Sequence, residues 1–135
     1  MLVISILEAD DFGEGLYPIM RNNLTSLIKQ QHVGLIIAAG DSKGMIYRLL
    51  SELSIEYPHI FCTILLSNDK LAYEKGCKEW PQIFSLDHSI AYGDQGSAKQ
   101  RRREFLIEHS DIVICRKTHC DGIRKKNCHC DIIAL

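Results

Sequence analysis

The sequence lacks a strong net charge, a long apolar run and any repeated or low-complexity segment, and each absence excludes a class of protein. Its 135 residues carry a formal net charge of -1, so the chain has no general attraction for nucleic acids or anionic membranes. No apolar stretch approaches the roughly 20 residues that cross a bilayer. Acidic residues at positions 8, 10 and 11 stand where a secretion signal would be apolar. We therefore expect one cytoplasmic, globular domain over residues 1–135.

The sequence also lacks a C-x-x-C pair, although it contains six cysteines. With no export signal, and with Cys62 and Cys115 inside strand-like apolar runs, reduced thiols are the expectation. The C-terminal segment does hold enough donors for a tetrahedral zinc site, namely Cys115, His119, Cys120, Cys128, His129 and Cys130. Their spacing is poor for metal, because Cys128 and Cys130 would share one face of a strand while His129 points away.

We therefore expect Cys128 and Cys130 to fill core space and no metal to bind in this tail. If zinc did bind there, its ligands would come from His119, Cys120, Cys128 and Cys130. A nucleophilic Cys120 activated by His119 or His129 is disfavoured, since nothing in the sequence orients such a pair.

Four nearly continuous apolar runs predict strands that are covered on both faces, as in a parallel sheet. They are Leu2–Leu7, Val33–Ala39, Ile60–Leu66 and Ile112–Cys115. Apolar residues recur at helical spacing over 16–28 and 45–53, with Pro58 ending the second helix. The fold class is therefore α/β: a Rossmann-like, mostly parallel sheet flanked by helices, whose right-handed crossovers place a helix on each face.

Two parts of the chain are less regular. Residues 71–79 are compatible with a short helix and residues 89–92 with a short strand. A last strand is expected over 132–135, reached from Cys115 through a polar connection that looks too short for a full crossover helix and its loops. This strand is therefore expected to be antiparallel or irregularly attached.

The segment Gly96–Cys115 places a capped, basic helix directly before a buried strand. Ser97 and Gln100 form an S-x-x-Q capping box, which predicts that the helix begins there. Basic side chains in the first two turns oppose the helix dipole, which suggests that they serve a ligand; they are Lys99, Arg101, Arg102 and Arg103. The alternative is a solvated helix face with ion pairs to Glu104 or Glu108, and the three arginines cannot all face one ligand.

Ligands of open parallel sheets bind beyond the carboxyl ends of the strands, which directs attention to the loops there. After the second strand, Gly40-Asp41-Ser42-Lys43-Gly44 is a small-residue turn that opens a helix and lets backbone approach a phosphate. It matches neither a Walker A loop nor G-x-G-x-x-G, and a plain tight turn capped by Asp41 is the alternative. After the first strand, the acidic loop of Asp10 and Asp11 could hold a ribose hydroxyl or a magnesium ion, or be simply solvated.

With these residues identified, the chain resembles the YpsA-like branch of the SLOG superfamily, Rossmann-like domains related to the DprA/Smf and LOG proteins. The resemblance follows the chain in order through Asn23–Gln31, Val33–Gly40, Leu49–Pro58 and, most specifically, Gly96–Cys115. The chain departs from the family in several places. Glu8-Ala9-Asp10-Asp11 replaces a Gly-His-Arg-type turn, Arg102-Arg103-Glu104 replaces Arg-Asn-Arg, and the C-terminal Gly-Gly-Thr turn is shortened.

The resemblance implies binding of a nucleotide-derived or other phosphorylated small ligand, in a sensory or regulatory role. The residues expected to bind it are Gly40, Asp41, Ser42, Gly44, Arg102, Arg103, Asp10 and Asp11. Two alternatives stay open. One is a LOG-type nucleotide hydrolase, for which Asp41 and then Glu104 would be the catalytic carboxylates. The other is a non-catalytic interaction module, such as a homodimer, whose contact surface would be the basic helix and the Cys-rich tail.

Overall fold

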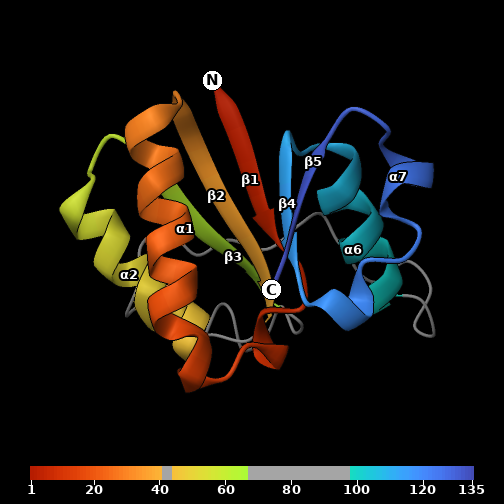
Figure 1. The fold of residues 1–135 in the computed structure, drawn as a ribbon, viewed down its shortest axis with the longest axis horizontal. Helices are drawn as coiled ribbons and strands as arrows, with labels where there is room; N and C mark the ends of the chain where they lie inside the picture. Colours follow the sequence, from red (N-terminus) through yellow and green to blue (C-terminus); the bar gives the residue numbers. More distant parts are fainter. Residues whose placement is uncertain (41–43, 67–97) are drawn as a thin grey trace.

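The computed structural model describes residues 1–40, 44–66 and 98–135 (Figure 1). Its strands are β1 (Leu2–Ile6), β2 (Val33–Gly40), β3 (Phe61–Leu66), β4 (Ile112–Cys115) and β5 (Asp131–Ala134). Its α-helices are α1 (Tyr17–Gln30), α2 (Met45–Glu56), α6 (Ala98–Glu108) and α7 (Ile123–Lys126). The described ranges also contain three short 3-10 helices, η1 (Ala9–Asp11), η2 (Glu14–Leu16) and η5 (Lys117–His119). The helix expected over 71–79 and the strand expected over 89–92 lie outside the described residues.

The five strands form one sheet in the order β3-β2-β1-β4-β5, and every neighbouring pair is parallel. This confirms the predicted Rossmann-like α/β fold. The expectation for the last strand was wrong, because β5 pairs with β4 in parallel, with Ile112 opposite Asp131 and Cys115 opposite Ala134. The connection over 116–130 suffices because two short helices, η5 and α7, carry the chain back along the sheet in place of one long helix.

The helices cover both faces of the sheet, but not as one crossover helix per face. Helices α1 and α2 contribute to the same core cluster on one face, while α6 and α7 contribute to a second cluster on the other. Figure 1 shows the two pairs on opposite sides of the sheet. The strand order explains this: right-handed crossovers that step from β1 to β2 to β3 keep their helices on one face, and the return to β4 reverses the direction.

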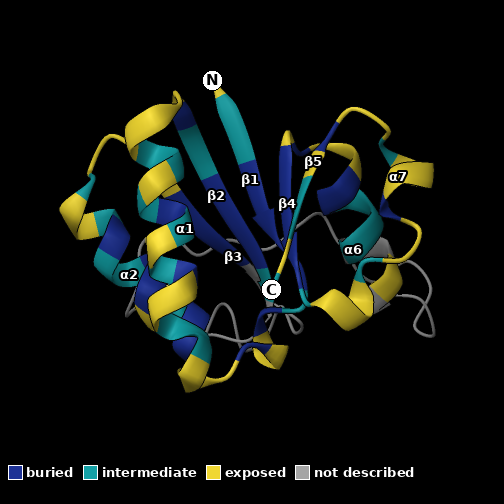
Figure 2. Ribbon diagram, viewed as in Figure 1, coloured by how far each residue is buried: buried dark blue, intermediate teal, exposed yellow. Residues whose placement is uncertain are grey.

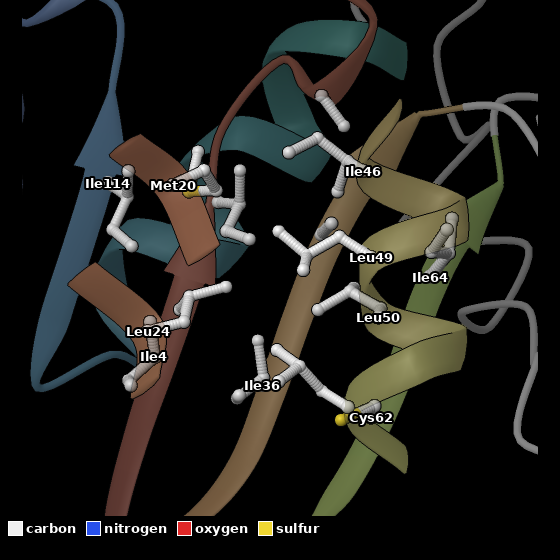
Figure 3. Close-up of a cluster of buried hydrophobic side chains, with 14 of the residues drawn as sticks. Ile4, Met20, Leu24, Ile36, Ile46, Leu49, Leu50, Cys62, Ile64 and Ile114 are labelled. Carbon is white, nitrogen blue, oxygen red and sulfur yellow. The ribbon is translucent and has the colours of Figure 1, made fainter. Parts of the chain in front are cut away.

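The larger core lies between the sheet and helices α1 and α2. Figure 3 shows Met20 and Leu24 of α1 and Leu49 of α2 pointing toward strand residues such as Ile4 and Ile36. All five of these side chains are fully buried. The buried residues of α2 fall at helical spacing, namely Met45, Ile46, Leu49, Leu50 and Leu53. Figure 2 shows the consequence, with the strands mostly buried and the exposed residues on the outer faces of the helices.

The helix ends follow the local sequence. Helix α1 begins at Tyr17 with Pro18 in its first turn, where a missing N–H costs nothing. Helix α2 ends at Glu56, two residues before Pro58, as predicted. Helix α6 begins at Ala98, next to the predicted capping box, although Ser97 itself lies outside the described residues. Across the described part of the chain, no helix combines the length and apolar character that a bilayer crossing requires.

The prediction that the thiols are reduced was wrong for one pair, because Cys115 and Cys120 form a disulfide. Cys115 is the last residue of β4, and η5 turns the chain back so that the two Cα atoms lie 6.0 Å apart. That separation is within the usual range for a disulfide. Of the other described cysteines, Cys62 and Cys130 are buried and Cys128 is exposed, and all three are thiols outside the disulfide.

Candidate functional site

The carboxyl edge of the sheet is the place where this topology builds a site. Strands β1 and β4 are neighbours, and the crossovers leaving them cover opposite faces. At such a switch point the loops after the two strands diverge and leave a crevice beyond the strand ends. Here the loop after β1 contains η1 and the loop after β4 contains η5. Both loops leave from the same level, since the N–H of Leu7 donates to the carbonyl of Ile114 at 2.9 Å.

Arg103 of α6 joins these two loops. Its Nε lies 3.4 Å from Glu8 Oε1 in the loop after β1. Its Nη2 donates to the carbonyl oxygen of His119 at 2.7 Å and to that of Asp121 at 3.4 Å. The side chains of Arg103 and Glu8 are each 16% exposed, so the ion pair is shielded and stronger than a surface pair. Arg103 therefore connects the loop after β1 to the loop after β4.

Glu8, in the loop after β1, contacts both Arg103 and His119. Its backbone has φ 53° and ψ 56°, in the left-handed region that a residue with a side chain adopts at a cost of about 1 kcal/mol or more. Its second carboxylate oxygen, Oε2, lies 3.5 Å from His119 Nδ1. The same His119 atom is 3.8 Å from Asp11 Oδ2. Two carboxylates and an imidazole, brought from opposite ends of the chain, thus meet in one place.

The structure places part of the predicted ligand site at this edge. Gly40 ends β2, Gly44 precedes α2, and Asp10 and Asp11 form η1 after β1. Arg103 is at the same edge, where it contacts protein groups as described. Asp41 and Ser42 lie outside the described residues, as does the side chain of Arg102.

The donors of the C-terminal tail do not come together. Cys120 is bonded to Cys115 at the carboxyl edge, whereas Cys128 and Cys130 precede β5 and therefore lie toward the amino edge. Cys130 fills core space as predicted, but Cys128 is exposed because residues 128–130 form a turn and not the start of the strand. His119 instead belongs to the cluster with Glu8 and Asp11. That cluster is the one group of three or more potential metal ligands within the described ranges.

A second polar network links α2 to α1 and to η2, which precedes α1. Arg48 donates to both carboxylate oxygens of Glu14, at 2.8 and 2.7 Å, and its guanidinium lies 4.9 Å from the centre of the Tyr17 ring. Hydrogen bonding from Arg48 lowers the pKa of Glu14, and the same bond raises the pKa of Arg48. The Tyr17 hydroxyl donates to Glu52, which raises the pKa of the tyrosine. These groups are largely exposed, so the network aligns the two helices and adds little to stability.

The sequence did not lead us to predict the ion pair between Glu8 and Arg103 or the contact between His119 and Asp11. From the sequence, Glu8 was interpreted as part of an acidic loop and His119 as part of a tail with potential zinc ligands. The residue numbers of Asp11 and His119 differ by 108. The signal that could have found them is the strand order. Once β1 and β4 are taken as neighbours, the loops after both strands must meet. Comparison of the chain with family models, with curated proteins and with solved structures finds no match.

Proposed function

We propose that this chain binds a phosphorylated, nucleotide-derived small ligand at the carboxyl edge of its sheet. The observation that carries the proposal is the switch point between β1 and β4, where helices leave for opposite faces. Ligands of open parallel sheets bind at such points. The resemblance of Gly96–Cys115 to the SLOG segment indicates the nucleotide-derived class.

The start of α2, at the same edge of the sheet, is suited to binding the phosphate group of such a ligand. Gly44 has φ +94°, and a Cβ added to it would meet nothing within 4 Å. The backbone there is therefore open to a close approach by a ligand. Helix α2 runs for 12 residues from Met45, so its N-terminal N–H groups present positive potential at the edge.

The basic helix α6 supplies the proposed charge partner. It begins at the carboxyl edge, because it runs toward the start of β4 at the other edge. Arg103 is engaged with Glu8 and with two carbonyl oxygens. We therefore propose that Arg102, one position earlier on the same helix, pairs with the negative charge of the ligand. Arg103 would instead hold the two loops together.

Titration calorimetry with AMP, ADP, ADP-ribose and pyrophosphate tests this proposal. We expect at least one of these to bind, and we expect Arg102→Ala to weaken that binding tenfold or more. Lys29→Ala is the matched control, since it removes one positive charge from the last turn of α1, at the opposite edge. No heat with any of the four compounds, or equal losses in both variants, would contradict the proposal and favour the interaction-module alternative.

A further inference from the structure

We infer that Glu8, Asp11 and His119 form a binding site for a divalent first-row transition-metal ion. One carboxylate oxygen of Glu8, one of Asp11 and one ring nitrogen of His119 all lie within 4.8 Å of one another. Asp11 and His119 are about half exposed and Glu8 is largely shielded, so the cluster is open to solvent on one side. Three protein ligands with an open side are the arrangement of metal sites that also bind a substrate or water.

The separations in the cluster suit a shared ion better than direct hydrogen bonds. His119 Nδ1 is 3.5 Å from Glu8 Oε2 and 3.8 Å from Asp11 Oδ2. Both exceed the usual 2.7 to roughly 3.2 Å of an N–H···O bond. Ligands placed about 2.1 Å from a tetrahedral ion are separated by roughly 3.4 Å, which is close to the two distances from His119 Nδ1.

Contacts around the cluster hold Glu8 and His119, whose Nδ1 also lies 3.4 Å from the Thr118 hydroxyl. Arg103 contacts Glu8 through Oε1, which leaves Oε2 directed at the cluster. The same guanidinium holds the carbonyl of His119, so one side chain positions two of the three ligands from outside. The disulfide between Cys115 and Cys120 closes the short loop that carries His119. Two carboxylates against one guanidinium leave a net negative charge, which attracts a cation.

The donor set selects the class of ion. One imidazole nitrogen with two carboxylate oxygens suits manganese, iron, cobalt, nickel or zinc better than magnesium or calcium, which bind oxygen almost exclusively. Thiols prefer softer ions than manganese. Mn²⁺ is therefore the best probe, because the free cysteines compete for it least.

The test is a titration of the chelator-treated, disulfide-intact chain with Mn²⁺, followed by electron paramagnetic resonance of the unbound ion. We expect one Mn²⁺ per chain, and at least a tenfold loss of affinity in Asp11→Asn and in His119→Ala. Asp131→Asn and His129→Ala, both at the amino edge of the sheet, are matched controls, one acidic and one imidazole, and both should bind as the wild type does. Arg103→Lys should bind less tightly than the wild type, as a positioning residue would.

Three results would overturn the inference: no saturable binding by the wild type, unchanged binding by His119→Ala, or an equal loss in the two controls. Thermal unfolding followed by circular dichroism shows whether a variant loses Mn²⁺ binding because a ligand is missing or because the fold is lost. The substituted side chains of Asp11 and His119 are 44% and 46% exposed, so both variants should unfold at the wild-type temperature. Because Mn²⁺ alone is the probe, the outcome is independent of whether a nucleotide binds.

Discussion

At the scale of single residues, the carboxyl edge depends most on Arg103. One guanidinium contacts a carboxylate after β1 and two backbone carbonyls after β4. Lysine carries the same charge but cannot present several N–H groups in a fixed plane. The relative position of the loops after β1 and β4 therefore depends on the guanidinium and not on the charge alone.

We expect Arg103→Lys to lower the free energy of unfolding by about 1–2 kcal/mol, since lysine keeps the charge but loses part of the roughly 1.5–3 kcal/mol that a hydrogen bond to a charged group contributes. Urea unfolding followed by fluorescence or circular dichroism measures this. Arg48→Lys is the comparison, because Arg48 also pairs with a carboxylate but is 48% exposed. It should change stability by less than about 0.5 kcal/mol. Equal effects of the two substitutions would show that Arg103 is an ordinary surface residue.

Asn127 plays a similar structural role at the opposite edge. Its side-chain amide donates to the carbonyls of Ile107 at 2.9 Å and Ser110 at 3.0 Å, where α6 ends. Its oxygen accepts from the N–H of His129 at 3.0 Å. One side chain thus satisfies the end of α6 and shapes the turn before β5.

We expect Asn127→Ala to destabilise the fold by about 1–3 kcal/mol, since two carbonyls lose their donor. Asn127→Asp separates the two roles. It keeps the acceptor for His129 but loses both donors, so it should cost nearly as much as alanine. Chemical unfolding of both variants measures these costs. An aspartate variant as stable as the wild type would mean that the bonds to α6 contribute nothing.

At the scale of elements, the start of α2 requires a glycine. Gly44 has φ +94° with open space around its Cβ position, so a side chain there would meet strain but no clash. We expect Gly44→Ala to cost about 1 kcal/mol or more in unfolding free energy. Gly13 also has open space, but its φ of -76° suits any residue. Gly13→Ala should therefore be neutral, and thermal unfolding of the pair isolates the backbone cost.

The loop after β4 is an element closed by a covalent bond. A disulfide across so few residues stabilises by roughly 2 kcal/mol in the chain-entropy model. We expect reduction, or Cys120→Ser, to lower the unfolding temperature by several degrees, whereas Cys128→Ser leaves it unchanged because Cys128 is exposed and free. Alkylation of the unfolded chain without reductant, followed by mass spectrometry, should leave Cys115 and Cys120 unlabelled. Labelling of both would contradict the disulfide.

At the scale of the whole molecule, periodicity predicted the described strands and the helices α1 and α2, because burial on both faces leaves continuous apolar runs. The direction of β5 was missed because its connection uses two short helices, which apolar spacing does not reveal. The location of the candidate site residues was predicted in part. Loop positions such as Asp11 and Gly44 follow from the strand ends, whereas the meeting of Glu8, Arg103 and His119 depends on which strands are neighbours.

Stability should also depend on pH through the buried thiol of Cys62. Burial raises the pKa of the Cys62 thiol to about 12, so the folded chain keeps the thiol proton at pH values where the unfolded chain, with an ordinary thiol pKa of 9.0, loses it. The contribution of Cys62 is therefore complete below pH 9 and is lost as pH rises through the folded pKa. Between pH 8 and pH 11, urea unfolding should show a steeper loss of stability for the wild type than for Cys62→Ala. Parallel pH profiles would contradict this.

The most direct measurement of the central claim is an amide NMR titration of the ¹⁵N-labelled chain with the nucleotide panel. Binding at the carboxyl edge predicts that shifts concentrate in residues 8–13, 40, 44–47 and 116–121. The amino edge, at residues 31–33 and 127–131, should stay unchanged. Shifts confined to the amino edge, or no shifts with any compound, would contradict a phosphorylated-ligand site at the switch point between β1 and β4.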